Sequence, residues 1–240
     1  MKNLFQETEI TPVAIVIPVH NDFIFFRIAV ESIIQNTLYP FKLIIIESES
    51  TDGSKEYADL LPKFYPNLDI RIVHTKKEGP MKAYNLGFEI SKPYDVYFTQ
   101  TDTYHPRLIG RDWLHELVKL SRLPSAGLMT CIGGTGIAGA PYKEGFEWVG
   151  GWCMYVPRKI LDQLGGFDEN FIIGDGTDIE FSYRIKQAGY NIYMAGFWID
   201  HHRLTAHSNE IIPDLEEIKK KNAEYFRKKY KLGEFVVVDR

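Results

Sequence analysis

The apolar run VAIVIPV, at residues 13–19, constrains the fold of this chain more than any other feature. It has no polar position and is rich in β-branched residues, with a proline near its end. A continuous apolar run of this length, unlike an alternating one, predicts a strand that is covered on both faces. A polar turn follows, in which Asn21 or Asp22 can cap a helix. The apolar positions of that helix follow helical spacing: Phe26, Ala29, Val30, Ile33 and Ile34.

The same strand-and-helix pattern repeats along the first half of the chain. A strand at residues 43–46 precedes a helix capped by Asp52, a strand at residues 69–75 precedes a helix from about Pro80 to Ile90, and residues 95–100 form a fourth strand. Strands and helices in short alternation predict parallel pairing, with right-handed crossovers and helices on both faces. The expected fold class is therefore α/β, with a Rossmann-like, mainly parallel central sheet.

The second half of the chain has a different pattern. Residues 127–157 are rich in glycine and aromatic residues and lack a clear period, which predicts strands and loops that line a cleft. A helix is expected from about Asp178 to Ala188, ended by Gly189. Residues 215–230 carry apolar side chains at helical spacing, so we expect an amphipathic helix that docks on the body of the protein rather than a membrane anchor.

Composition excludes several classes of protein. The chain has 240 residues, 45% of them hydrophobic, which is enough for one domain with a substantial core. Its net charge of −4, without a long block of like charges, argues against a nucleic-acid partner. No apolar run approaches the roughly 18 residues of a transmembrane segment. Cys131 and Cys153 form no CxxC pair, so we expect reduced, buried thiols and a cytoplasmic location.

Polar residues follow each of the first four expected strands. Ligands of open parallel sheets bind beyond the carboxyl ends of the strands, so these residues should meet at one edge. Asp102, flanked by Gln100 and Thr103, offers the oxygen donors that a divalent cation prefers, and a histidine from elsewhere could complete a manganese-like site. Each acidic residue also has a simpler structural explanation: Glu47 as a solvated turn residue, Asp102 as a turn residue, and Asp52 and Asp178 as helix caps.

Several segments, in this order, carry a resemblance to a known family. The chain resembles the family 2 glycosyltransferases, which have the GT-A fold, a nucleotide-binding α/β sheet joined to an acceptor-side lobe. The resemblance implies one domain over residues 1–240, with a nucleotide-binding half at about 10–105, an acceptor and catalytic half at about 106–210, and a docking helix and tail at about 211–240. The segments are IVIPVHN, IIIESESTDGS, GPMKAYNLGFEIS, YFTQTDTYHP, GGWCMYVPRKILDQLGGFDENF, GDGTDIEFSYRIKQAGY and HH.

The resemblance implies roles on the donor side of the site. Glu47 stands where the family has the acidic residue that accepts hydrogen bonds from the donor's base. Asp102 stands at the metal-ligand position, and Gln100 replaces the first carboxylate of that motif. His201, or His202 as the alternative, would complete the metal site. Pro18, His20, Asn21, Lys82, Asn85 and Thr101 complete the expected nucleotide-sugar-binding set on this side.

Other roles lie on the acceptor side. Asp178 stands at the position of the general base, at a helix start where the dipole favours an ionised carboxylate. Thr177 replaces the glutamate of the motif, and Asp175 and Glu180 are the nearest rival bases. Arg184 would bind a carboxylate or phosphate. Gly151, after Gly150, and Trp152 would lie beside the donor sugar and acceptor, with the indole stacked on a ring.

The function that the resemblance implies is inverting sugar transfer. A divalent cation, Mn²⁺ or Mg²⁺, would neutralise the diphosphate of a UDP, TDP or GDP sugar, and Asp178 would take the proton of a glycan or other acceptor hydroxyl. Glycan or polysaccharide synthesis is the expected setting. Two alternatives stay open. A sugar nucleotidyltransferase needs a glycine-rich, basic loop after the first strand, where PVHNDF has neither glycine nor lysine. A non-catalytic sugar-nucleotide or glycan-binding relative would fit the changes at Gln100 and Thr177.

Overall fold

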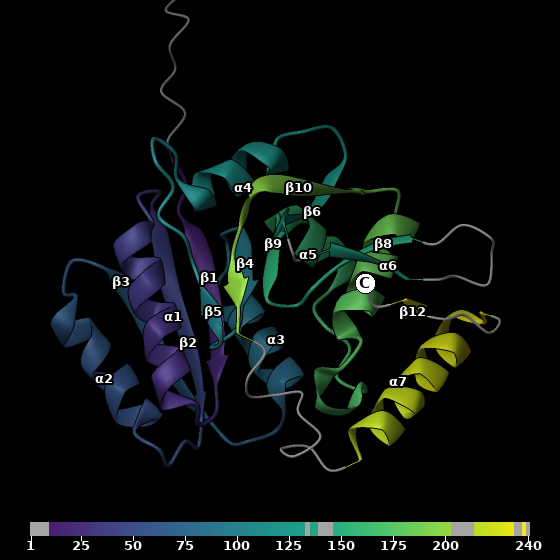
Figure 1. Ribbon diagram of the computed structural model, residues 1–240, viewed down its shortest axis with the longest axis horizontal. Helices are drawn as coiled ribbons and strands as arrows, with labels where there is room; N and C mark the ends of the chain where they lie inside the picture. The colour runs from purple at the N-terminus through teal and green to yellow at the C-terminus, as the bar shows by residue number, and fades with distance from the viewer. Residues whose placement is uncertain (1–9, 133–134, 139–145, 203–213, 233–236, 239–240) are drawn as a thin grey trace, which may run out of the picture.

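The computed structural model describes residues 10–132, 135–138, 146–202, 214–232 and 237–238. Its central element is a seven-stranded sheet with the order β10-β6-β9-β4-β1-β2-β3 (Figure 1). The pairs β1–β2, β2–β3, β1–β4 and β6–β10 are parallel, whereas β9 is antiparallel to β4 and to β6. The strands are β1 Val13–Val19, β2 Phe41–Ser48, β3 Asp69–Thr75, β4 Val96–Thr99, β6 Ala126–Ile132, β9 Cys153–Val156 and β10 Asn191–Trp198.

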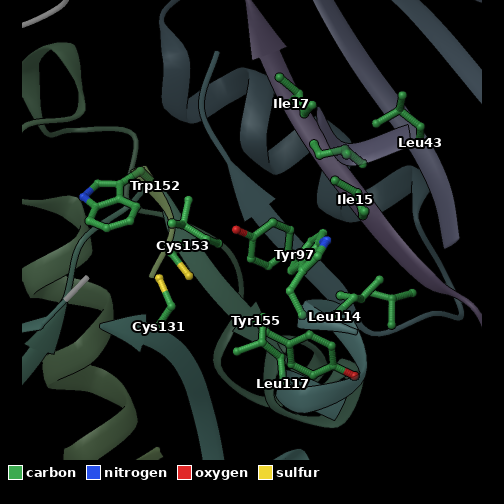
Figure 2. Packing of buried hydrophobic residues seen from close by; sticks show 14 of the residues in the cluster. Ile15, Ile17, Leu43, Tyr97, Leu114, Leu117, Cys131, Trp152, Cys153 and Tyr155 are labelled. Carbon is green, nitrogen blue, oxygen red and sulfur yellow. The ribbon is translucent and has the colours of Figure 1, made fainter. Parts of the chain in front are cut away.

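Helices cover both faces of this sheet, as the alternating pattern predicts. On one face, side chains of α1 (Phe23–Asn36), α2 (Ser54–Phe64) and α4 (Trp113–Ser121) pack against Ile15 and Ile17 of β1 (Figure 2). On the other face, α3 (Pro80–Ile90), α5 (Arg158–Leu164) and α6 (Thr177–Gln187) pack around Ala14 and Val16. Alternate residues of one strand therefore enter two cores, which explains why the run at residues 13–19 has no polar position.

Gly87 fixes how closely α3 approaches the sheet. A Cβ atom at this position would lie 2.3 Å from Cγ1 of Val16, a distance that real Cβ contacts do not show. The glycine lowers the helix propensity of α3, but it allows the backbone of the helix to contact β1 directly. This contact lies in the last turn of α3, and it packs that turn directly on the middle of β1.

The second half of the chain contributes more to the sheet than its sequence indicates. The described part of residues 127–157 forms strands and loops, as expected, and Trp148 and Gly151 among them line a cleft, but β6 and β9, together with β10, also extend the central sheet. Cys131 and Cys153 are free and buried in these strands, as expected (Figure 2). No helix in the described ranges is both long and apolar enough to cross a membrane.

Smaller elements form a lobe beside the carboxyl edge. β7 (Thr135–Ala138) pairs with β8 (Phe146–Val149) and with β12 (Val237–Val238). A short 3-10 helix, η1 (Ile172–Gly174), precedes α6. β5 (Thr103–Tyr104) and β11 (Asp200–His201) form an antiparallel pair in which His201 is the partner of Thr103. This pairing brings the predicted histidine beside the predicted metal-binding segment.

Asp52 holds the starts of two helices. Its Oδ1 accepts a hydrogen bond from the backbone N–H of Ser54, the first residue of α2, at 3.0 Å, and its Oδ2 accepts one from the N–H of Phe23, the first residue of α1, at 2.7 Å. Asp22 stands at the N-cap position of α1, as predicted, but the carboxylate that accepts from the first N–H of the helix is that of Asp52. Asp22 has a left-handed backbone, with φ 76°, and makes no side-chain cap. Its carboxylate instead accepts a hydrogen bond from the Thr101 hydroxyl at 2.7 Å.

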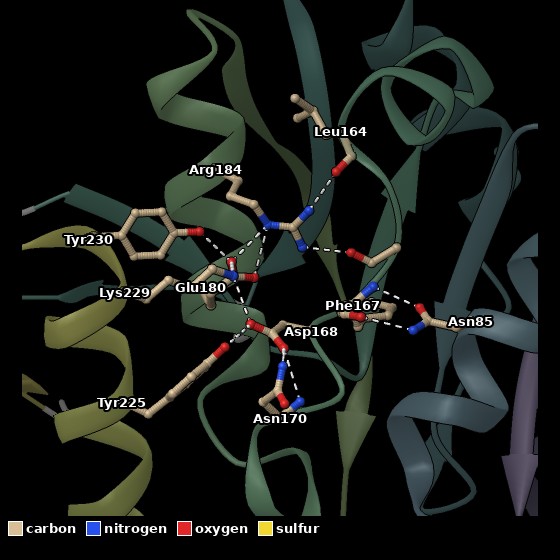
Figure 3. A network of polar contacts seen from close by, with 11 residues as sticks. Asn85, Leu164, Phe167, Asp168, Asn170, Glu180, Arg184, Tyr225, Lys229 and Tyr230 are labelled. Atoms are coloured by element: carbon tan, nitrogen blue, oxygen red, sulfur yellow. Dashed lines mark hydrogen bonds and ion pairs between the residues drawn. The ribbon is translucent and has the colours of Figure 1, made fainter.

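The C-terminal helix α7 (Leu215–Tyr230) is attached to α6 by charged side chains (Figure 3). Glu180 of α6 is fully buried and accepts hydrogen bonds from Lys229, at 2.6 Å, and from the hydroxyl of Tyr230. Lys229 and Tyr225 also reach the carboxylate of Asp168, at 2.7 and 2.9 Å. The helix predicted from apolar spacing therefore packs on the body of the protein through a polar network as well as through buried Phe226.

Candidate active site

A cleft of about 1000 Å³ lies at the carboxyl edge of the sheet, between the ends of the strands and α7. Its walls come from the turns after β1 and β4, the amino ends of α3 and α6, and one side of α7. The predicted site residues that line it are Pro18, His20, Gln100, Thr101, Asp102, Gly151 and Asp178.

Asp102 and His201 face each other at this edge. The Asp102 side chain is almost fully buried, and its Oδ2 lies 3.3 Å from Nε2 of His201. The backbone N–H of His202 donates to the backbone carbonyl of Asp102 at 2.8 Å, which fixes the two segments together. The His202 side chain is exposed and lies near the ring of Phe25. Of the two histidines that the sequence offers, His201 is therefore the one beside Asp102.

The environment of His201 suits a divalent cation. Its imidazole stacks on the indole of Trp152, with ring centroids 4.8 Å apart, and its Nδ1 is buried without a hydrogen-bond partner. The nitrogen that faces Asp102 is Nε2, and a cation shared with the Asp102 carboxylate would bind the lone pair of this atom, with the imidazole proton on the buried Nδ1. One carboxylate and one imidazole form a donor set that manganese-like ions accept. No group of three or more metal-binding side chains lies together in the described ranges, so the protein offers two donors here.

Asp178 and Gln100, which follows β4, both lie close to Gly151. Its Oδ2 accepts a hydrogen bond from the N–H of Gly151 at 3.1 Å, and its Oδ1 accepts one from the N–H of Ile179 at 2.8 Å. A Cβ at Gly151 would lie 3.8 Å from Nε2 of Gln100 and 3.7 Å from Cβ of Asp178. The absent side chain leaves the backbone of this loop open between the two polar groups.

Burial controls the protonation of Asp178. It raises the pKa of the Asp178 carboxyl to about 6, while the hydrogen bonds from Ile179 and Gly151 act in the opposite direction. The sequence-based expectation was that the helix dipole would favour the ionised form, and desolvation outweighs that effect. A carboxyl with this pKa is ionised at neutral pH and still basic enough to accept a proton efficiently.

Comparison with known proteins identifies the family. The model of the family described as "Glycosyl transferase family 2" matches residues 14–177. The chain belongs to glycosyltransferase family 2. It is similar to the O-antigen biosynthesis protein RfbC of Myxococcus xanthus, with 25% identity over 241 residues. The match covers 85% of this chain but 18% of that protein, so the chain spans less than a fifth of the length of this relative.

Solved structures confirm the GT-A fold that the resemblance implies. The mannosyltransferase PcManGT of Pyrobaculum calidifontis, solved with GDP-Man and Mn²⁺, matches with a TM-score of 0.63 and 20% identity, over 78% of this chain and 57% of that one. GalNAc-T7, solved with UDP, GalNAc and Mn²⁺, matches with a TM-score of 0.65 and 15% identity, over 94% of this chain and 55% of that one.

Several residues that family 2 resemblance assigns to the site lie outside the cleft. Trp152 is 8% exposed and covers His201, so its ring face is not open to a sugar. Arg184 binds Glu180 at 2.9 Å and donates to the carbonyls of Leu164 and Gly166 (Figure 3). Its charge is therefore already matched by a buried carboxylate and two carbonyl groups, and it holds the loop before α6.

Lys82 and Asn85, both on α3, are also not among the residues that line the cleft. Lys82 forms an exposed ion pair with Glu78 at 3.3 Å. The Asn85 amide donates to the carbonyl of Phe167 and accepts from its N–H, at 2.8 and 2.7 Å (Figure 3). Asn85 thus attaches α3 to the loop that follows α5, which is a structural task.

Glu47 is more buried than a solvated turn residue, and that alternative is wrong. The side chain is 1% exposed, and both carboxylate oxygens are engaged, Oε1 by the N–H of Ser50 at 2.6 Å and Oε2 by Nδ1 of His74 at 2.8 Å. Burial acts to raise the pKa of Glu47, but the bonds from His74 and Ser50 outweigh it and the pKa is lowered. Each oxygen of Glu47 keeps a lone pair beyond these bonds, but with the side chain 1% exposed a nucleotide base could reach it only if neighbouring atoms moved.

His20 and Asn21 join the turns after β1 and β2. Nδ1 of His20 donates to the carbonyl of Ser48, and the Asn21 side chain accepts from the N–H of Thr51 at 2.9 Å. His20 lines the cleft, whereas Asn21 does not. The two residues hold the donor-side rim in a fixed shape.

The cleft also contains residues that sequence reasoning did not assign to it. Asp22, which we expected to cap a helix, lines the cleft beside Asp102, and burial raises its pKa, with Asp102 adding to the effect. Trp148 of β8 lines the cleft, as do Lys219 and Lys220 of α7. The sequence could have indicated Asp22, because it lies in the polar turn of residues 20–22 that follows the first strand. No such indication exists for the lysines of α7, since a charged helix face is ordinarily solvated.

Proposed function

We propose that this chain is an inverting glycosyltransferase, which moves a sugar from a nucleoside diphosphate sugar to an acceptor hydroxyl with the help of a divalent cation. The observation that carries the proposal is the placement of two groups on one cleft. Asp102 lines the cleft and lies 3.3 Å from His201, which is not itself among the lining residues, and the buried carboxylate of Asp178, which accepts a hydrogen bond from Gly151, lines the same cleft. A cation site and a base therefore flank the space where a donor sugar would lie.

Asp102 and His201 would hold the cation. When bound, Mn²⁺ or Mg²⁺ neutralises the charge that develops on the diphosphate leaving group. Trp152 keeps the imidazole of His201 in place by stacking, and the β5–β11 pairing keeps it beside Asp102. The amide of Gln100 stands beside Gly151 and can donate a hydrogen bond to a donor hydroxyl or a bound water.

Asp178 would take the proton from the acceptor hydroxyl. Its carboxylate is held by two backbone N–H groups, so the orientation of the basic oxygens is fixed before an acceptor arrives. As the acceptor oxygen attacks the anomeric carbon, its proton moves to Asp178 and the diphosphate leaves from the opposite face. One displacement inverts the configuration of the anomeric carbon and needs no covalent sugar intermediate on the protein.

The relatives support the class of substrate. RfbC is named for O-antigen biosynthesis, and the two structural neighbours were solved with GDP-Man or with UDP and GalNAc, each with Mn²⁺. We therefore propose a UDP, TDP or GDP sugar as donor, and glycan or polysaccharide synthesis as the setting. A sugar nucleotidyltransferase is disfavoured because the PVHNDF turn contains neither glycine nor lysine for a phosphate loop.

A calorimetric screen of UDP, TDP and GDP, each with and without Mn²⁺, tests the proposal. We expect one diphosphate to bind tightly, and only with the cation. Hydrolysis of the matching sugar nucleotide then separates an enzyme from a non-catalytic binding relative, because slow cation-dependent release of sugar is expected only of the enzyme. Failure of all three diphosphates to bind would contradict the proposed donor class.

A further inference from the structure

A second hollow lies at the other end of the sheet from the cleft. It is lined by residues just before β1, the turn after α1, the loop at residues 107–112 and the outer side of α4. In Figure 1, α4 lies at the top of the molecule, whereas α7, which lines the cleft, lies toward the bottom. We call the surface formed by Ile10, Leu38, Arg107, Ile109, Arg111 and Arg122 the α4-end face.

Large apolar side chains on the α4-end face are unusually exposed. Ile109 is 100% exposed at the tip of its loop, where Gly110 turns the chain with φ 69°. Leu38 is 83% exposed and Ile10 is 62% exposed, and both line the same hollow. Single exposed apolar residues are ordinary, but several around one hollow indicate a surface that is covered in use.

The same face carries a local excess of positive charge. Arg107, Arg111 and Arg122 are exposed, and none has a carboxylate within 4.0 Å in the part of the chain that the structure describes. The acids nearby are already engaged. Asp112 accepts hydrogen bonds from the N–H groups of Leu38 and His115.

The remaining acid and base of the hollow neutralise each other, since Glu116 pairs with Lys119 at 2.7 Å. The hollow is lined by four basic side chains, Arg107, Arg111, Lys119 and Arg122, and by two carboxylates, Asp112 and Glu116, so it carries a net positive charge although the whole chain has a net charge of −4. The sequence Arg107-Leu108-Ile109-Gly110-Arg111 places two of these charges on either side of the most exposed apolar residue. Arginines around an exposed apolar tip match a surface of anionic headgroups over hydrocarbon.

We propose that the α4-end face binds peripherally to an anionic lipid bilayer, with Ile109 inserted at the interface and the three arginines at the level of the headgroups. A second copy of the chain fits this face poorly, because a symmetric contact would bring the two sets of arginines together. Binding at this end leaves the cleft at the carboxyl edge open to solvent. The proposal does not depend on the reaction proposed for the cleft.

Flotation of the full chain with lipid vesicles tests the proposal. We expect binding to vesicles of phosphatidylcholine mixed with phosphatidylglycerol, little binding to phosphatidylcholine alone, and weaker binding as salt is added. Each basic residue at an anionic surface strengthens binding about fivefold, so the double variant Arg107→Gln/Arg111→Gln should bind about 25-fold more weakly. Ile109→Ser should lose roughly tenfold through the lost apolar contact.

Matched controls change the same chemistry elsewhere. Arg71→Gln alters an exposed arginine of β3, and Ile24→Ser alters a residue of α1 that is 67% exposed, and both variants should bind as the parent does. Circular dichroism checks that every variant is folded. Equal binding of the parent to neutral and anionic vesicles would overturn the proposal, as would unchanged binding of the double variant. Self-association in sedimentation velocity that Ile109→Ser abolishes, without vesicle binding, would show that a second copy covers the face instead.

Discussion

His201 Nε2 lies 3.3 Å from Asp102 Oδ2, although the two residues come from distant parts of the chain. The pairing of β5 with β11 produces this contact, and the indole of Trp152 stacks on one face of the imidazole. The two donors are therefore preorganised for a cation. The loss of either should lower the affinity for the cation more than the stability of the fold.

Asp102→Ala and His201→Ala are each expected to remove the cation dependence of nucleoside diphosphate binding. The remaining single donor would hold the cation weakly, and affinity should fall by roughly 10–100-fold. Calorimetry with and without Mn²⁺ measures this effect. His202→Ala is the matched control, because its backbone N–H still bonds Asp102 while its exposed ring is lost. Unchanged cation dependence in both test variants would remove this pair from the site.

Asp178→Asn is expected to lower turnover by about 10²–10⁴-fold, with donor binding intact, because an amide cannot accept the proton. Transfer rates at saturating donor measure the effect. Asp175→Asn is the control, since Asp175 also lines the cleft but does not bond Gly151. If Asp175→Asn is the slow variant and Asp178→Asn keeps near-parental turnover, the base has been misassigned.

The activity of the parent should depend on the ionisation of Asp178. Because burial raises its pKa to about 6, the carboxyl is protonated and inactive as a base below that pH. Turnover should therefore rise as the pH passes through about 6 and level off above it. A pH profile measured at saturating donor checks this, and a flat profile between pH 5 and 8 would contradict the role of Asp178.

The same substitution should stabilise the fold at neutral pH. The pKa of Asp178 is raised in the folded state, so ionisation costs stability as the pH rises from 3.8 through about 6, and the uncharged amide of Asp178→Asn would avoid that cost. After the loss of one backbone hydrogen bond, the net gain should be on the order of 1–2 kcal/mol. Thermal melts at pH 4 and pH 8 measure it. A gain that is equal at both pH values would not come from this carboxyl.

Glu47→Gln is expected to destabilise the fold by about 1–2 kcal/mol, because it weakens the charge-assisted bond to His74. The pKa of Glu47 is lowered and that of His74 is raised, chiefly by their mutual bond in the case of His74. The bond between Glu47 and His74 therefore contributes fully to the free energy of unfolding between the ordinary pKa values of the two groups, 4.5 and 6.5. This contribution decreases as the pH rises through the raised pKa of His74. Melting temperatures at pH 6 and pH 9 should show a larger difference at pH 6. His74→Gln should remove the pH dependence of that difference.

Asp52→Ala should cost about 2 kcal/mol, more than an ordinary cap, because the carboxylate serves the first N–H of both α1 and α2. Urea titrations measure the loss. Asp69→Ala, which removes an exposed carboxylate paired with Lys42 at the start of β3, is the control and should change stability little. A loss no larger than that of the control would mean that water replaces the caps without cost.

The sequence predicts the parts of the fold that depend on local pattern. The continuous apolar run at residues 13–19 predicts a strand that is buried on both faces. The apolar spacing in residues 215–230 predicts a helix with one buried face. The residues after strand ends, such as Asp102 and His20, could also be placed at the cleft, because parallel strands end at a common edge.

The rest depends on contacts that no local pattern contains. β6 and β10 join the sheet through pairing between segments far apart in sequence, and Trp152 turns its ring to His201 rather than to the cleft. Arg184 matched a family position, yet a buried carboxylate one turn away on its own helix binds it. The partner of a charged side chain depends on how deeply both groups are buried, and burial is known only from the folded structure of the whole chain.

The hydrogen bonds of Glu180 with Lys229 and Tyr230 attach the C-terminal tail to α6, so the tail could be replaced without a change to the central sheet. α7 contributes one wall of the cleft without contributing a strand to the central sheet, and the side chains of Asn222, Lys229 and Tyr230 attach it to the residues around α6. Grafting a different tail would therefore change that wall while the donor-side rim stayed the same, provided the new tail again supplied a cation for Glu180. Simple truncation would leave a buried carboxylate with one fewer positive neighbour, so the tail can be exchanged far more safely than it can be removed.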